Sequence, residues 1–395
     1  MFLLPRLKVP RAIRFGDVEI APFDIAISNG DPLAPSARKV LESYRKLGGA
    51  PAEGSLMWPV NRSPSSVAMT DDRILFRHRD ALSMGLIAMN EYYRNVASSN
   101  VTDAHCDGIL HPLTADLTHL AFHKRRREGF YGDAFPIEQL KTTTPLAASV
   151  EPTLRIDEDL LGAVAVALGR SDPLAERLIG AIPAFLQGSR LAETTAVIDD
   201  IVWMASAFER LLAATQPVGK NLSLTIAAAF SAYPHGATSW PYTSMSGNIT
   251  TEYGPWVQSW MREYYTVRSS LHRGISVRGT WSELNHSVIA AEVFSLLVKL
   301  ELDTAGLRSL TEDDECAAEA LDTRIERLAT APGHPIEAWW EPFDAARRNR
   351  TVTSMAAAVA AAMPLPPTSM TSTPSAAATG TSAAEDGEDS TDTGP

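Results

Sequence analysis

The sequence PWVQSWMREYYTVRSSLHR, residues 255–273, carries apolar side chains at the spacing of an α-helix. Its large side chains recur every three or four residues: Trp256, Trp260, Tyr264, Val267 and Leu271. On a helix of about 3.6 residues per turn this spacing puts them in one stripe that can face a core. Gly274 follows, and a glycine just past the last turn favours the end of a helix. We therefore predict an amphipathic helix from Pro255 to about Arg273.

Helical patterns continue on both sides of this stretch. Apolar residues at helical spacing fill 174–185, 191–212 and 284–298, and a shorter run lies near 222–230. Asp172-Pro173 offers an N-cap followed by a proline at the first helical position. Residues 280–283, TWSE, have the spacing of a capping box. Further amphipathic helices are predicted at about 312–330 and 336–348, so residues 151–350 should form a mainly helical domain.

The first 150 residues have a different pattern. Apolar and polar residues alternate between Arg14 and Ile27, which favours short strands. Helical spacing appears after Ser36 and again between residues 74 and 93, and residues 141–152 shift to Thr, Ala, Ser and Pro. We predict a mixed α/β domain over 1–150 that senses or docks a partner not yet identified. The predicted fold class is α+β, with a disordered acidic tail over 364–395.

Composition limits the function classes. With 35 Lys and Arg against 47 Asp and Glu, the formal charge is −12, so bulk electrostatics would not bind nucleic acid and any polyanion must be met locally. The two cysteines lie far apart in sequence and cannot form a disulfide framework. We find no export signal and no apolar stretch long enough to cross a membrane, which predicts a soluble cytoplasmic protein. The sequence has no GxxxxGK[ST], no GxGxxG opening a helix and no GxSxG, and we expect no cofactor.

The helix at 255–273 also carries residues with chemical potential. Arg268 and His272 are four residues apart and share a face of that helix. A guanidinium can hold a phosphate, and an imidazole that titrates near neutrality can move a proton. Residues 262–278 contain four arginines and one glutamate, so they form a basic island on an acidic chain.

Residues 265–274, YTVRSSLHRG, preceded by the acid-bearing segment AFERLL at 207–212, resemble the HEPN superfamily, particularly its Apea-like branch. The resemblance covers about residues 170–303. It implies a four-helix bundle that usually forms a homodimer with a composite cleft, and a metal-independent endoribonuclease of the prokaryotic defence or toxin type. It further implies that His272 acts as acid and base at the ribose 2′-hydroxyl or the leaving 5′-oxygen, that Arg268 stabilises the phosphorane, and that Ser269 is the small polar neighbour.

The motif is shortened, because only three residues separate Arg268 from His272 and Arg273 stands where a longer gap would put the histidine. A non-catalytic HEPN-like module that binds RNA or nucleotide, or mediates protein association, is therefore the alternative. Arg268 could pair with Glu209 or Glu292 across the bundle, and we prefer a structural role for Glu209 in orienting Arg268. The expected partners are RNA and a second copy of the chain. His286, on the following helix, is expected to be exposed.

A second group of residues invites a metal. His119 and His123 are four apart, and Asp116 lies one helical turn earlier, so an amphipathic helix would place all three on one face. The three residues between the histidines do not build the HExxH motif. A chance grouping is the favoured interpretation, and we predict no metal site.

Overall fold

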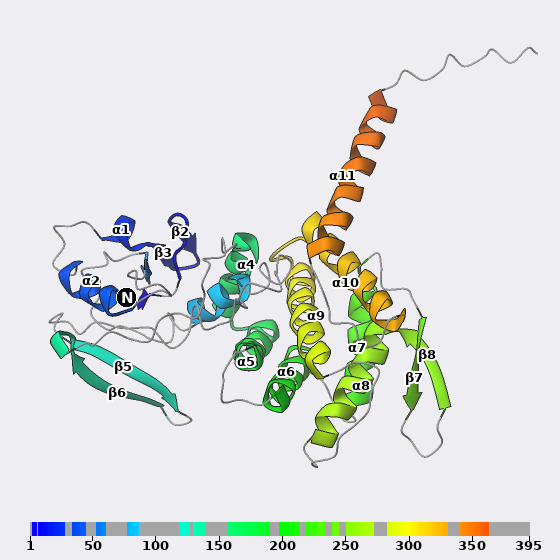
Figure 1. Ribbon diagram of the computed structural model, residues 1–395, viewed down its shortest axis with the longest axis horizontal. Helices are drawn as coiled ribbons and strands as arrows, with labels where there is room; N and C mark the ends of the chain where they lie inside the picture. Colours follow the sequence, from blue (N-terminus) through cyan, green and yellow to red (C-terminus); the bar gives the residue numbers. More distant parts are fainter. Residues whose placement is uncertain are drawn as a thin grey trace, which may run out of the picture. The chain divides into compact units, whose positions relative to one another are not determined.

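The computed structural model describes the chain in segments separated by gaps. These segments are 2–5, 7–27, 34–44, 53–60, 77–86, 119–126, 129–139, 156–189, 197–213, 218–233, 239–244, 250–271, 283–330 and 340–362. They combine a small antiparallel sheet with a larger set of helices, which confirms the predicted α+β fold class (Figure 1). The predicted boundary at 141–152 and the predicted disordered tail at 364–395 lie outside the described residues.

The N-terminal part of the chain forms a four-stranded antiparallel sheet in the order β1-β4-β3-β2. Its strands are β1 (Phe2–Leu4), β2 (Ile13–Phe15), β3 (Val18–Pro22) and β4 (Ser55–Pro59). The alternation noted at 14–27 produces β2 and β3, which pair across Gly16-Asp17 with Phe15 opposite Val18. Gly16 has a φ of 54°, a conformation that glycine adopts without a steric penalty. Short strands are therefore correctly predicted over the first part of 14–27, but residues 23–26 form a short helix instead.

Both faces of this sheet are covered. One face, with Leu3, Leu56 and Trp58, packs with α1 (Phe23–Ala26) and α2 (Ala34–Ser43). The other face shares its apolar core with a helix over 77–86 and with α4 (Glu158–Leu168). Successive residues of a strand point to opposite faces, which explains why almost every position of β1 and β4 is buried.

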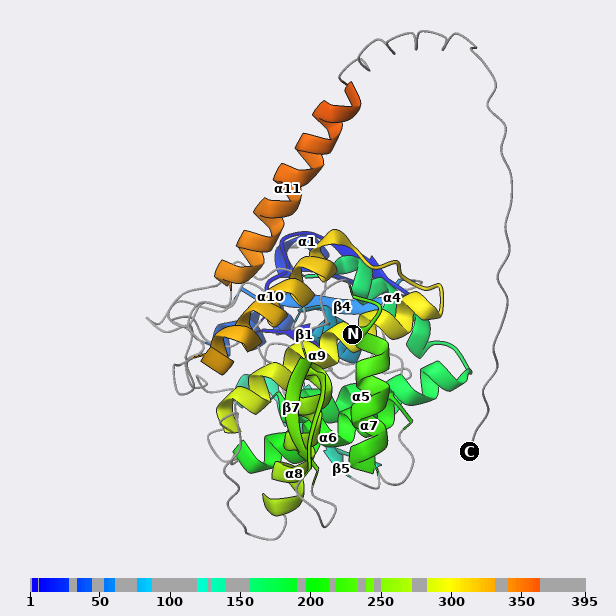
Figure 2. The same ribbon diagram turned by 90° about the vertical axis from the view of Figure 1, so that its right-hand side faces the viewer.

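Two β-hairpins lie outside the sheet. Strands β5 (His119–Arg126) and β6 (Gly129–Pro136) pair antiparallel and are followed by the short 3₁₀ helix η3 (Ile137–Gln139). The predicted helix through His119 and His123 is therefore wrong, because the pattern read as helical is part of a hairpin closed at Gly129. In the second hairpin, β7 (Ser239–Ser244) pairs antiparallel with β8 (Thr250–Pro255) (Figures 1 and 2).

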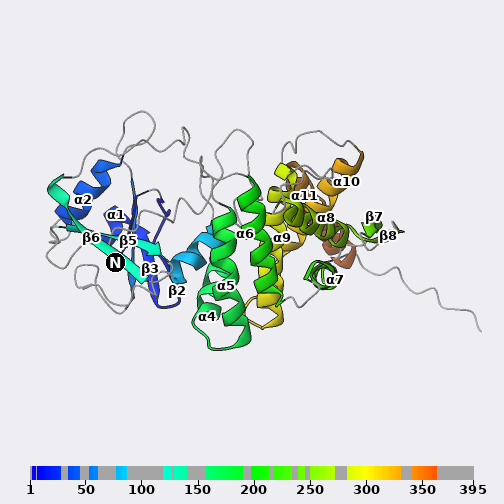
Figure 3. The same cartoon turned by 90° about the horizontal axis from the view of Figure 1, so that it is seen from below.

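The helices pack around α9 (Glu283–Thr304). Every residue from 289 to 300 is buried, as expected for a mainly apolar helix that others surround, and its buried charges Glu292 and Lys299 are paired with ions of opposite sign. Figures 1 and 3 show α9 between the pair α5 (Pro173–Gly188) and α6 (Val197–Leu211) and the pair α7 (Val218–Phe230) and α8 (Trp256–Leu271). The predicted N-cap of α5 is confirmed, since Asp172 accepts a 2.8 Å hydrogen bond from the amide of Ala175.

The C-terminal helices are α10 (Glu312–Thr330) and α11 (Trp340–Ala362). Helix α10 matches the predicted range of about 312–330. Helix α11 continues well past residue 348, where its end was predicted. The chain divides into a unit of residues 1–349 and a unit of residues 350–395, of which the end of α11 is the described part. Within the described residues, no helix is both long enough and apolar enough to cross a membrane.

Candidate functional site

Helix α8 carries two of the predicted site residues, Arg268 and Ser269, and its aromatic side chains fix it against its neighbours. The Trp260 and Tyr264 rings both pack edge-on to Phe208 of α6, at centroid distances of 6.0 and 6.3 Å. The Tyr264 hydroxyl donates a 2.9 Å hydrogen bond to the carbonyl oxygen of Ile201. Because aromatic rings supply large buried area with defined geometry, these contacts set the position of the following turn of α8.

That following turn presents Arg268. Its Nη2 atom lies 3.6 Å from Oε1 of Glu209 on α6, and both side chains are partly exposed, at 27% and 28%. The guanidinium carbon lies 5.3 Å from the centroid of the Tyr265 ring. Its Nε has no hydrogen-bond acceptor among the described residues. Arg268 is therefore held by one distant carboxylate and one aromatic face.

The predicted alternatives for the partner of Arg268 are resolved by this geometry. Glu209 contacts Arg268, whereas Glu292 of α9 accepts two 2.8 Å hydrogen bonds from Arg324 of α10. Ser269 follows Arg268 in α8 and is half-buried. His272 and Arg273 lie outside the described residues, so the structure brings together Arg268, Ser269 and Glu209 from the predicted set.

A buried histidine lies close to this region, and the prediction that it would be exposed is wrong. His286 of α9 is 0% exposed, and its Nε2 lies 3.4 Å from Oε1 of Glu263. Its ring meets the Tyr264 ring edge-on at 5.4 Å. Spacing could have identified it, because His286 precedes the buried positions Ile289 and Val293 at helical intervals.

An acid with a perturbed pKa also lies near Tyr264. Burial, reinforced by the adjacent charge of Asp199, raises the pKa of Asp200 from 3.8 to about 6. Burial raises the pKa of the Tyr264 hydroxyl, the charge of Asp200 raises it further, and Arg268 opposes the change. Asp200 and Arg268 are thus both near enough to act electrostatically on the same hydroxyl. The sequence signal that could have identified Asp200 is the adjacent pair of acids, Asp199 and Asp200, in the first turn of α6.

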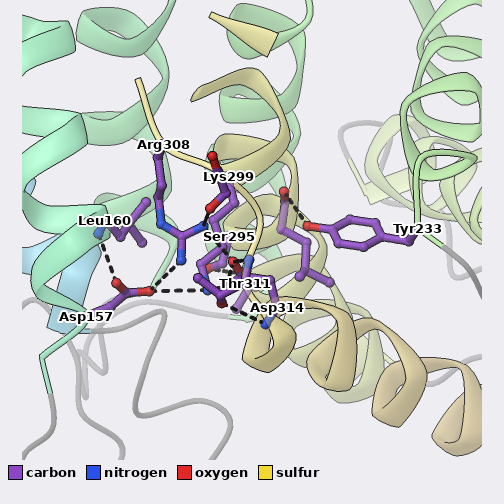
Figure 4. A network of polar contacts seen from close by, with 11 residues as sticks. Asp157, Leu160, Tyr233, Ser295, Lys299, Arg308, Thr311 and Asp314 are labelled. Atoms are coloured by element: carbon purple, nitrogen blue, oxygen red, sulfur yellow. Dashed lines mark hydrogen bonds and ion pairs between the residues drawn. The ribbon is translucent and has the colours of Figure 1, made fainter. Parts of the chain in front are cut away.

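A buried polar cluster lies elsewhere, between α4, α9 and the start of α10 (Figure 4). Lys299 lies 2.7 Å from Asp314 Oδ1 and 3.5 Å from Asp157 Oδ2, while Arg308 lies 2.5 Å from Asp314 Oδ2 and 3.4 Å from Asp157 Oδ2. Asp157 also caps α4, and Asp314 accepts a 2.9 Å hydrogen bond from the Thr311 amide. Two cations thus meet two carboxylates, which is the arrangement that buried charges require. We assign this cluster to structure.

The residues considered as metal ligands are only partly described by the structure. His119 and His123 belong to β5, and Asp116 lies outside the described residues. Among the described residues, no three His, Cys, Asp or Glu side chains gather where they could hold a metal ion.

Comparison with known proteins adds no assignment. No protein-family model matches the chain, and neither the curated proteins nor the solved structures give a significant match.

Proposed function

We propose that this chain is a HEPN-like, metal-independent endoribonuclease of the prokaryotic defence or toxin type. The observation that carries the proposal is the loose hold on Arg268 at the end of α8. Its distance of 3.6 Å to Glu209 exceeds the roughly 2.7–2.9 Å of a charge-assisted hydrogen bond. A partly exposed ion pair of this kind contributes about 0–1 kcal/mol, so a phosphate group would replace Glu209 at small cost.

The proposed reaction is a transesterification at the ribose 2′-hydroxyl. His272 takes the proton of the 2′-hydroxyl or returns one to the leaving 5′-oxygen. The 2′-oxygen bonds to phosphorus while the bond from phosphorus to the 5′-oxygen breaks, which leaves a 2′,3′-cyclic phosphate and a 5′-hydroxyl. Arg268 stabilises the negative charge that develops on the phosphoryl oxygens. Ser269 and Arg273 are supporting residues of the site in this proposal.

The proposal includes two further assignments. Two chains associate as a homodimer, so that two Arg268 and His272 pairs share one cleft. The predicted N-terminal domain over 1–150 senses or docks a partner that controls cleavage. The localised arginines fit this arrangement, because a chain with a net charge of −12 must bind RNA at a limited basic surface.

A second candidate is a non-catalytic HEPN-like module that binds RNA or nucleotide, or mediates protein association. The contact between Arg268 and Glu209 favours it, because a carboxylate already neutralises the guanidinium. The gap of three residues between Arg268 and His272 also favours it, since one residue more or less turns a helical side chain by about 100°.

Cleavage of mixed cellular RNA and tRNA in EDTA tests the first candidate. The assay compares the native protein with Arg268→Ala, His272→Ala and the control Arg348→Ala, which removes an exposed arginine from α11. We expect products with 2′,3′-cyclic phosphate ends, loss of about 10²-fold or more in the first two variants, and native activity in the control.

The assay also separates the two candidates. No cleavage by a folded, dimeric native protein contradicts the endoribonuclease. RNA binding by that inactive protein, measured by fluorescence anisotropy and weakened in Arg268→Ala but not in Arg348→Ala, would support the binding module instead. Equal cleavage by all four proteins would exclude Arg268 and His272 from the reaction.

A further inference from the structure

Tyr265 precedes Arg268 by three residues and lies beneath its guanidinium. The guanidinium carbon is 5.3 Å from the ring centroid, within the distance at which a cation is attracted to an aromatic face. Tyr265 is only 8% exposed, so its ring is held by the surrounding bundle while Arg268 reaches toward solvent. The ring is therefore a buried platform under a more exposed cation.

The first turn of α7 also lies close to this ring, at Gly219. A Cβ atom placed on Gly219 would lie 3.2 Å from Cδ1, 3.4 Å from Cγ and 3.5 Å from Cβ of Tyr265. The first of these distances is shorter than an ordinary carbon contact, so the close approach of α7 to Tyr265 depends on the absence of a side chain at residue 219. Any larger residue there would press directly on the platform.

The two groups that hold Arg268 differ in how they respond to a phosphate. Glu209 carries a negative charge and competes with a phosphate for the guanidinium, whereas the ring of Tyr265 carries none and keeps its contact after an anion binds. Arginine binds a phosphate best when its planar group is already oriented. Without the ring, the Arg268 guanidinium would therefore lose its orientation when a phosphate displaces Glu209.

We propose that Tyr265, supported by Gly219, is the positioning residue that keeps Arg268 oriented while Glu209 gives way to an RNA phosphate. This inference rests on the proposed function and adds to it a division of roles between the two groups around Arg268. Tyr265 does not touch RNA, since it is buried, and acts only through Arg268.

A double-mutant cycle on RNA cleavage tests the inference. The native protein is compared with Tyr265→Leu, Arg268→Ala and the double variant, and Tyr265→Phe is the conservative control. The Tyr265 hydroxyl has no hydrogen-bond partner among the described residues, so Tyr265→Phe should retain native activity within about twofold. Tyr265→Leu should lower kcat about tenfold with little change in KM, and should have no further effect in the Arg268→Ala background.

A second pair of variants tests the same role without replacing the buried Tyr265. Gly219→Ala should lower kcat in the same direction as Tyr265→Leu, whereas Gly162→Ala, at a helical glycine with open space around its Cβ position, should leave kcat unchanged. If Tyr265→Leu fails to fold, Tyr265→Met takes its place in the cycle, because the longer and more flexible methionine side chain adapts to the space of the ring without offering an aromatic face.

The outcomes separate this inference from the proposed function. If the native protein cleaves RNA and Tyr265→Leu equals it, or if Tyr265→Leu is as harmful with Arg268 absent as with Arg268 present, the positioning role is overturned while the endoribonuclease stands. If the folded native protein neither cleaves nor binds RNA, the proposed function itself fails, and the role of Tyr265 fails with it.

Discussion

Replacement of Lys299 by methionine should strongly destabilise the protein. The Lys299 side chain is 0% exposed and is balanced by Asp314 at 2.7 Å and Asp157 at 3.5 Å. Methionine preserves most of the volume and removes the charge, so the cluster changes from two cations and two anions to one cation and two anions. Arg308 alone must then neutralise two buried carboxylates.

The magnitude follows from that uncompensated charge. Removal of one partner from a buried ion pair costs about 3–5 kcal/mol, because the remaining ion stays desolvated. Burial would raise the pKa of Asp314, but Lys299 and Arg308 together hold it at about 2. Without Lys299, one carboxyl should take up a proton well above that pH. The loss of stability should therefore be largest near pH 7 and smaller near pH 5.

Urea unfolding followed by circular dichroism and tryptophan fluorescence measures this effect at both pH values. The control Lys220→Met removes an exposed lysine from α7 and should change the free energy of unfolding by less than about 0.5 kcal/mol. The double variant Lys299→Met with Asp314→Asn restores neutrality and should lose less than the sum of the single losses. A loss below about 1 kcal/mol in Lys299→Met, or a loss that does not vary with pH, would refute the assignment of this cluster to structure.

Three further predictions follow from single positions. Gly188→Ala should cost about 1–3 kcal/mol, because its Cβ would lie 2.8 Å from Cγ of Met204, whereas Gly162→Ala, with nothing within 4 Å, should gain about 0.5–1 kcal/mol; urea midpoints of both variants check the pair. Folding lowers the pKa of Asp314 from 3.8 to about 2, so its carboxylate contributes about 2 kcal/mol to the free energy of unfolding above pH 4 and loses this contribution as the pH falls through 2. The melting temperatures of the native protein and of Asp314→Asn should therefore converge near pH 2. The pKa of Asp200 is raised to about 6, so its ionised form disfavours folding above that pH. Asp200→Asn should therefore raise the melting temperature at about pH 7 but not at about pH 4. The gain at about pH 7 should be at most about 1 kcal/mol, because the group is only partly buried.

The sequence predicts this fold best where local signals decide the structure. The stripe at 255–273 and the Asp172-Pro173 cap correspond to α8 and to the start of α5, because both signals act within a few residues. Strand β4 was missed, since residues 50–66 contain the Pro and Gly residues typical of loops and β4 forms only by pairing with β1 and β3. The hairpin of β5 and β6 was missed because the spacing of His119 and His123 was read as helical.

The candidate site shows a similar limit. The sequence indicates that Arg268 lies at the flank of a buried face, but its choice of Glu209 over Glu292 depends on how α6 crosses α8 and on Arg324 occupying Glu292. The platform under Arg268 is equally non-local, because it needs the approach of Gly219 from α7. Helical spacing alone gives the face of a residue and not the element that covers it.

The apolar core that joins the sheet to the helices has a consequence for how the protein unfolds. Phe2 and Ile20 of the sheet and Leu160 of α4 belong to the same buried cluster as Phe294 of α9 and Leu321 of α10. A sheet that shares its interior with a bundle cannot open alone without exposing part of the bundle to water. Slowly exchanging amide protons in β1 and in the middle of α9 should therefore report one common free energy of opening, and truncation of the first strands should weaken helices that lie nearly three hundred residues away along the chain.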